Sequence, residues 1–144
     1  MRDIDAVSGD VIDVALRLHR ELGPGLLESV YETLLAARLI KDGYAVGRQR
    51  PIDIEFDGVR VENAFRIDLL VDERLIVEIK SVDQLLPVHG KQLLTYLRLT
   101  KQPVGLLINF GGATLKEGIR RVVNDHLSAS PRLRVNQNSS YTKE

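Results

Sequence analysis

Two acidic residues and a lysine near the middle of the chain have the types and spacing of a divalent-metal site. Glu78 and Lys80 end a strongly apolar run, and in a β-strand their side chains point to one face while Ile79 points to the other. Asp68 belongs to the preceding apolar segment, and a hairpin turn at 72–74 brings it beside them. Carboxylate oxygens are preferred ligands of Mg²⁺ and Mn²⁺, and such a cation activates water for hydrolysis. These residues therefore predict a metal site with hydrolytic chemistry.

The same residues also have a structural interpretation. A Glu-x-Lys pair at the end of a strand is common on protein surfaces, where both charges stay hydrated. Burying a carboxylate and an ammonium without partners is costly. The metal-site interpretation therefore requires further polar groups nearby.

The composition restricts the kinds of site that the chain can build. Its 144 residues suit one domain with a hydrophobic core, and the absence of cysteine excludes disulfides, thiolate zinc sites and thiol nucleophiles. The three histidines are scattered along the sequence. A metal site must therefore be rich in oxygen ligands, which favours magnesium or manganese.

The charge is balanced, with 20 basic and 20 acidic residues. Strong nonspecific nucleic-acid binders usually have a basic surplus, so this balance argues against one. From residue 112 to the end, however, six basic residues stand against three acidic ones, which is weak support for a polyanionic partner. No apolar run reaches the roughly 20 residues of a membrane span, and residues 1–5 lack a signal-peptide pattern, so we expect a cytoplasmic protein without membrane contact.

Two amphipathic helices are predicted before the acidic residues. Helical spacing of apolar residues places the first over 8–22, with Ser8 as its cap, and the second over 26–41, after a Gly-Pro-Gly break. The expected apolar face of the second helix is Leu27, Val30, Tyr31, Leu34, Leu35 and Leu39. Glu28 lies in its first turn, where the helix dipole alone already favours an acid.

A meander of antiparallel strands follows. The predicted strands are 44–48, 52–56, 59–62 continuing into 65–71, and 75–80. Asp57-Gly58 is a strong hairpin signal. Pro87 opens a third helix that ends at 101–103, and the apolar run 104–109 is typical of a buried strand. Strand, helix and buried strand in this order predict a parallel crossover.

The end of the chain leaves one alternative open. The segment 115–127 fits a helix or an edge strand, and we favour a strand at 118–123. Residues 128–144 have little to bury and are predicted to be a disordered tail. The predicted fold is therefore α/β (α+β), a single domain over 1–127 with a central mixed sheet flanked by helices.

The third helix carries a polar stripe on an otherwise apolar surface. His89, Gln92 and Tyr96 are three and then four residues apart, so they share one side of the helix. Either this stripe meets the strand end at Glu78 and Lys80, or it is a solvent-facing edge.

Several of these motifs together resemble one known family. Residues 25–31 read G-x-x-E-x-x-Y, and they occur in order with Asp68, with Glu78-Ile79-Lys80 and with a Q-x-x-x-Y element at Gln92 and Tyr96. The combination resembles the small bacterial GxxExxY protein family of the PD-(D/E)XK nuclease superfamily. The resemblance covers roughly residues 4–123. It implies a PD-(D/E)XK nuclease-like core.

The resemblance also implies roles for individual residues. Asp68 and Glu78 would bind Mg²⁺ or Mn²⁺, with the carbonyl of Ile79 as a further ligand, and Lys80 would orient the attacking water or stabilise negative charge. Glu28 would reach the metal site as an additional acid.

Two more residues follow from the third helix. Gln92 and Tyr96 resemble the element that lines the site in the RecB/Cas4-like branch of the superfamily. The residue before Asp68 is Ile67 rather than proline, a departure that the superfamily tolerates.

Three functional hypotheses follow. The first is a metal-dependent nuclease that hydrolyses phosphodiester bonds of nucleic acid, with DNA favoured over RNA. The second is a non-catalytic binding or regulatory module that keeps the nuclease fold and acts through a protein or nucleic-acid partner. The third is a structural protein that acts through an exposed sheet edge. Short edge strands also favour a homodimer.

Overall fold

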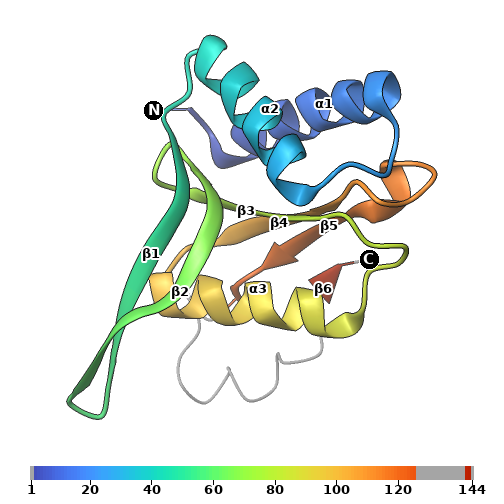
Figure 1. The fold of residues 1–144 in the computed structure, drawn as a ribbon. Coiled ribbons are helices and arrows are strands. Elements are labelled where there is room, and N and C mark those ends of the chain that lie inside the picture. The colour runs from blue at the N-terminus through green and yellow to red at the C-terminus, as the bar shows by residue number, and fades with distance from the viewer. Residues whose placement is uncertain (1, 126–141, 144) are drawn as a thin grey trace.

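The computed structural model describes residues 2–125 and 142–143. A β-sheet lies at its centre, with helices on both faces (Figure 1). The helices are α1 (Ile4–Leu22), α2 (Glu28–Lys41) and α3 (Pro87–Thr100), with a short 3₁₀ helix η1 (Lys116–Gly118). The strands are β1 (Val46–Phe56), β2 (Val59–Val71), β3 (Leu75–Lys80), β4 (Val104–Asn109), β5 (Ile119–Val123) and β6 (Thr142–Lys143).

The strands lie side by side in sequence order. β1, β2 and β3 form an antiparallel meander, and β4 is parallel to β3 because α3 crosses over between them. β5 and β6 then continue antiparallel. The predicted α+β fold with a mixed sheet is confirmed, as is the crossover. The strand predicted at 118–123 is found as β5, which begins one residue later because Gly118 belongs to η1.

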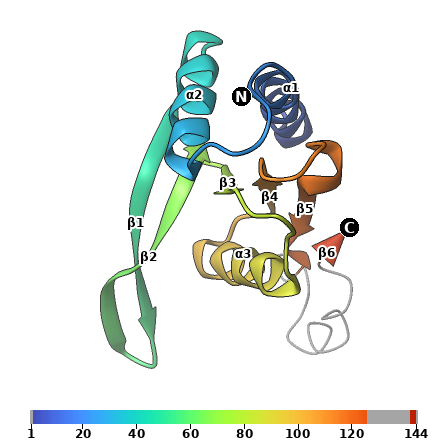
Figure 2. The same ribbon diagram turned by 45° about the vertical axis from the view of Figure 1, so that its right-hand side comes forward.

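Hydrophobic residues fill both faces of the sheet. α1 and α2 cover one face and α3 covers the other (Figure 2). Along β3, Val77 and Ile79 belong to the cluster under α1 and α2, whereas Ile76 belongs to the cluster under α3. Because side chains alternate along a strand, Glu78 and Lys80 project on the α3 side, as the sequence predicts.

β1 and β2 extend beyond the other strands as a two-stranded arm (Figure 1). Asp57 and Gly58 form its turn with φ angles of 52° and 76°, and the strands pair directly on either side at Phe56 and Val59. Positive φ at both central residues is typical of the type I′ hairpin turn. The hairpin predicted from Asp57-Gly58 is confirmed.

Some predicted boundaries were wrong. α1 begins at Ile4, and Ser8 lies buried inside the helix rather than capping it. The segments predicted as two strands, 44–48 and 52–56, form the single strand β1, which passes through Pro51 as the edge strand of the sheet. An edge position tolerates proline because its missing N–H would face solvent.

The buried face of α2 is also narrower than predicted. Leu27, Val30 and Leu34 are exposed, although the sequence interpretation placed them inward. The buried residues of α2 are Tyr31, Glu32, Leu35, Ala36 and Leu39. An acid thus occupies a position on the inner face of this helix.

The predicted disordered tail, 128–144, lies outside the described residues except at Thr142–Lys143, which pair with β5 as β6. None of the helices in the described part of the chain has the length and apolar character that a membrane span requires.

Candidate metal centre

The site forms where β2 and β3 separate. Their backbone pairing runs from Val71 and Leu75 to Leu69 and Val77 and then stops. The next residue of β2 is Asp68, whose Oδ2 accepts a hydrogen bond from the Ile79 backbone N–H at 2.8 Å. A carboxylate therefore continues the strand pairing at the point where the backbones part.

Glu78 lies beside this carboxylate and is buried, with 6% of its surface exposed. Burial raises the pKa of Glu78 to about 10, with further contributions from hydrogen bonding to Asp68 and from the negative charge of Asp68. The Oε1 atom of Glu78 has no hydrogen-bond partner within the described residues. In the absence of a cation, Glu78 therefore holds a proton at neutral pH.

Lys80 and Tyr96 interact electrostatically with the acidic pair. The positive charge of Lys80 lowers the pKa of Glu78, although less than burial and Asp68 raise it. Burial raises the pKa of Tyr96, and the charges of Glu78 and Asp68 raise it further. The Tyr96 ring stacks on Phe65 of β2, with ring centroids 4.0 Å apart. Tyr96 of α3 thus lies close enough to Glu78 and Asp68 for their charges to act on its hydroxyl.

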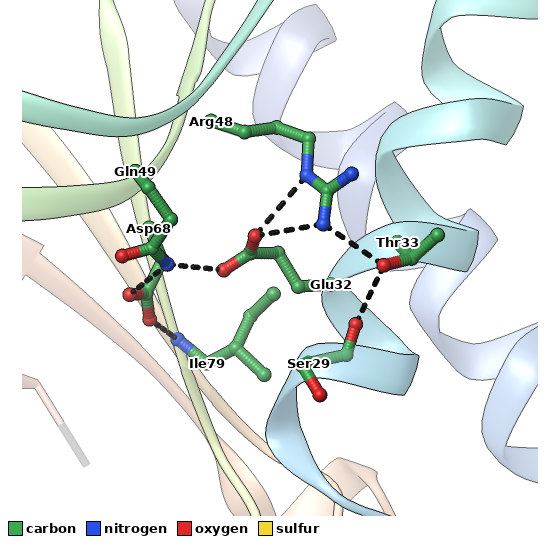
Figure 3. Close-up of polar contacts among 7 residues, drawn as sticks. All are labelled: Ser29, Glu32, Thr33, Arg48, Gln49, Asp68 and Ile79. Carbon is green, nitrogen blue, oxygen red and sulfur yellow. Dashed lines mark hydrogen bonds and ion pairs between the residues drawn. The ribbon is translucent and has the colours of Figure 1, made fainter.

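Two polar residues that the sequence analysis did not single out are connected to Asp68, Gln49 directly and Glu32 through Gln49 (Figure 3). Gln49 of β1 donates from Nε2 to Asp68 Oδ1 at 3.2 Å and to Glu32 Oε1 at 2.6 Å. Glu32 is the buried acid of α2, and its Oε2 accepts from Arg48 Nε at 3.1 Å. The one feature of the sequence that could have identified Glu32 is its helical spacing with Leu35 and Leu39, which places it on the buried face of α2.

Glu28 lies elsewhere. It is exposed at the start of α2, in a surface hollow lined also by residues 25–27, 81–83 and 111. Across residues 2–125, no hydrogen bond or ion pair joins Glu28 to Asp68 or Glu78. The structure therefore does not bring Glu28 into polar contact with the acidic pair.

The three polar residues of the α3 stripe make different contacts. His89 accepts a hydrogen bond at Nδ1 from the Leu86 backbone N–H at 3.0 Å, so it caps the start of α3. Gln92 is exposed and makes no hydrogen bond within the part of the chain that the structure describes. Of the three stripe residues, Tyr96 is the one whose pKa is raised by the charges of Asp68 and Glu78.

The glycine and the tyrosine of the G-x-x-E-x-x-Y motif have structural roles. Gly25 has a φ of 106°, in the region that favours glycine. The buried Tyr31 hydroxyl donates to the Gly23 carbonyl at 2.6 Å and accepts from the Leu26 N–H at 3.2 Å, which holds the connection between α1 and α2. The Tyr31 ring stacks on Phe110, with centroids 4.3 Å apart.

The acidic pair fits a divalent cation. The described residues contain no group of three acidic, histidine or cysteine side chains arranged to hold a metal ion. Asp68 and Glu78 are nevertheless close enough to interact strongly, and Glu78 Oε1 is a buried oxygen with no donor among residues 2–125. A cation bound between the carboxylates would take the place of the proton on Glu78 and satisfy this oxygen.

The fold and the site together define a nuclease-like α+β domain, with an acid in one strand where its pairing with the next strand stops, and Glu-x-Lys at the end of that next strand. The chain belongs to the PD-(D/E)XK nuclease superfamily, because the family model of that description matches residues 5–122. No curated protein and no solved structure matches the chain.

Proposed function

We propose that the protein is a nuclease that hydrolyses phosphodiester bonds with Mg²⁺ or Mn²⁺ held by Asp68 and Glu78. The observation that carries this proposal is the buried carboxyl of Glu78, which lies against Asp68 and whose Oε1 has no hydrogen-bond partner in the part of the chain that the structure describes. A buried carboxylate beside a second, half-buried one is costly unless a proton or a cation lies between them. Membership in a nuclease superfamily supports a phosphodiester substrate.

The residues around the acidic pair have distinct roles in this proposal. Bound to the carboxylates and to the carbonyl of Ile79, the cation would polarise a phosphoryl oxygen and lower the pKa of water. Lys80 supplies a positive charge beside Glu78, where it orients the attacking water and stabilises negative charge on the phosphoryl group. Tyr96 forms a wall of the site through its stack on Phe65.

The proposal extends to the branch of the superfamily, the nucleic-acid substrate and the oligomeric state. The motif residues favour the GxxExxY family, in which Glu28 would be an additional acid of the site, and the RecB/Cas4-like branch, in which Gln92 and Tyr96 line the site. Gln92 is exposed on α3, on the same helix as Tyr96, so it is available to a substrate. DNA is the substrate to test before RNA, and pairing through the edge strand β1 is the route to a homodimer.

Calorimetric titration with Mn²⁺ tests the proposal without a choice of substrate. The wild type is expected to bind about one or two ions per chain, and Asp68→Ala is expected to lose them while its thermal unfolding in EDTA remains cooperative. Asp42→Ala is the matched control, because Asp42 is an exposed aspartate at the end of α2 whose side chain pairs only with Arg38 among the described residues. A wild type that binds no Mn²⁺ contradicts the proposal and favours the non-catalytic module.

A panel of DNA and RNA substrates follows if Mn²⁺ binds. Hydrolysis that requires Mn²⁺ and disappears in Asp68→Ala is the expected result. A protein that binds the ion but cleaves neither polymer contradicts the nuclease proposal.

A further inference from the structure

The Asp68 carboxylate receives one hydrogen-bond donor on each oxygen. The Ile79 N–H points at Oδ2, and the Gln49 amide points at Oδ1. Two donors on opposite oxygens fix both the position and the rotation of a carboxylate plane. Each oxygen still keeps a lone pair for another ligand.

Gln49 itself is held by a second carboxylate. Its Nε2 lies between Glu32 Oε1, at 2.6 Å, and Asp68 Oδ1, at 3.2 Å, as Figure 3 shows. Both neighbours are acceptors, so the NH₂ end of the amide must face them. Glu32 thereby determines which end of Gln49 is presented to Asp68.

Glu32 is itself anchored from β1 and α2. It is 5% exposed, and its Oε2 accepts from Arg48 Nε at 3.1 Å. Arg48 also donates from Nη2 to Thr33 Oγ1 at 2.8 Å, and Thr33 Oγ1 donates to the Ser29 carbonyl at 2.7 Å. These hydrogen bonds hold the Glu32 carboxylate in place, and Glu32 in turn holds Gln49 against Asp68.

The backbone of Gln49 adds an independent observation. Its φ is 49°, in the left-handed region that non-glycine residues rarely adopt. Such a conformation is strained and tends to occur where it positions a functional group. Here it accompanies a side chain that reaches from the edge strand to the acidic pair.

We propose that Gln49, oriented by Glu32, is a positioning residue that holds the Asp68 carboxylate ready for a divalent cation. The proposal rests on the metal-dependent function above and adds two residues to it. Donors that orient a ligating side chain typically contribute about 10–100-fold to metal affinity.

The experiment is calorimetric Mn²⁺ titration of Gln49→Asn, with thermal unfolding in EDTA as a second readout. Asparagine adopts positive φ readily, but its side chain is one carbon shorter and cannot bridge both carboxylates. We expect Mn²⁺ affinity to fall about 10–100-fold while the unfolding temperature in EDTA stays near that of the wild type. Gln102→Ala is the matched control, because within residues 2–125 the Gln102 side-chain amide donates only to the Glu73 carbonyl, at 3.2 Å.

A double variant tests whether Glu32 acts through Gln49. Glu32→Gln alone is expected to weaken Mn²⁺ binding, whereas adding it to Gln49→Asn should weaken binding no further, because the pathway is already cut. If the two substitutions instead weaken Mn²⁺ binding additively, Glu32 does not act through Gln49. If Gln49→Asn unfolds in EDTA, Gln49→Gly provides the same measurement, because glycine adopts positive φ freely.

The outcomes separate this proposal from the function on which it rests. Gln49 variants that bind Mn²⁺ within about twofold of the wild type, while Asp68→Ala does not bind, contradict the positioning role alone. A wild type that binds no Mn²⁺ contradicts the metal-dependent function itself.

Discussion

Asp68 and Ile79 are joined by a side-chain hydrogen bond at the position where a backbone pair would otherwise continue. The Asp68 Oδ2 accepts from the Ile79 N–H at 2.8 Å, immediately beyond the last pair of β2 and β3. One carboxylate therefore serves both the sheet and the candidate site. Substitutions of Asp68 must be interpreted for both roles.

Asparagine at this position should separate the two roles. Asp68→Asn keeps an oxygen for the Ile79 N–H, whereas Asp68→Ala leaves that part-buried donor without its partner. We expect Asp68→Asn to be more stable than Asp68→Ala by about 1–3 kcal/mol in chemical unfolding. Both variants should lose Mn²⁺ binding, because neither has a carboxylate. Equal stability of the two variants would show that the bond to Ile79 contributes little.

Glu78→Gln should change how stability depends on pH. The folded-state pKa of Glu78 is about 10 and the ordinary value is 4.5, so between these values the folded protein keeps a proton that the unfolded chain releases. Stability is therefore lost as pH rises from 4.5 toward 10. In EDTA, calorimetric unfolding of Glu78→Gln should show a smaller fall in melting temperature between pH 5 and pH 9 than the wild type shows.

Glu73→Gln is the control with the opposite sign. Hydrogen bonding to Arg50 lowers the pKa of Glu73, so its contribution to stability is present above the ordinary pKa and lost as pH falls. Parallel pH profiles for the wild type and Glu78→Gln would contradict the raised pKa of Glu78.

Lys80→Met should separate hydrolysis from metal binding. The Lys80 charge lies beside Glu78 and opposes a bound cation, so Mn²⁺ affinity should be retained or increased. Loss of one preorganised positive group at the developing charge should reduce kcat by about 10²–10³-fold. Mn²⁺ calorimetry and a hydrolysis assay, on whichever substrate the DNA and RNA panel identifies, make the comparison. A variant that cleaves at the wild-type rate contradicts the role of Lys80.

Tyr31→Phe should lower stability without changing metal binding. The substitution keeps the stack on Phe110 but removes the hydroxyl that joins Gly23 and Leu26. We expect a loss of about 1–3 kcal/mol in chemical unfolding, because the two backbone groups lose a part-buried partner. An unchanged stability would mean that water replaces the hydroxyl at no cost.

Gly111→Ala should be far more damaging than the same change one residue later. A Cβ on Gly111 would lie 2.2 Å from the Val82 carbonyl oxygen, whereas one on Gly112 would meet only the Thr114 oxygen at 3.5 Å. The close approach is fixed by Asn109, which binds the Val82 N–H and carbonyl through its amide. We expect thermal unfolding to show a large loss for Gly111→Ala and a small one for Gly112→Ala.

The fold was largely predictable because its elements follow local periodicity. Alternation along β3 correctly placed Ile79 in the core and Glu78 with Lys80 on the opposite face. Pro87 marked the start of α3, and the buried run of β4 identified the crossover. These features depend on residues close together in the sequence.

The candidate site was predictable only in part, because its contacts join separate elements. Gln49 stands between two arginines in an edge strand, and nothing local indicates that its backbone turns or that its amide meets Asp68. For α2, an apolar face drawn too wide included Leu27 and Leu34 and obscured Glu32. The helix packing against β1 determines which of its acids faces inward, and that packing is a tertiary property.

The arm of β1 and β2 has a kinetic consequence. Near its turn only two strands pair, and Phe56 and Val59 are 72% and 61% exposed, so little burial opposes local opening there. Backbone amides around 54–61 should therefore exchange their hydrogens with deuterated water much faster than those of β3 and β4, which are flanked on both sides. Since Gln49 and Asp68 lie at the base of the arm, the boundary between fast and slow exchange should fall close to the acidic pair.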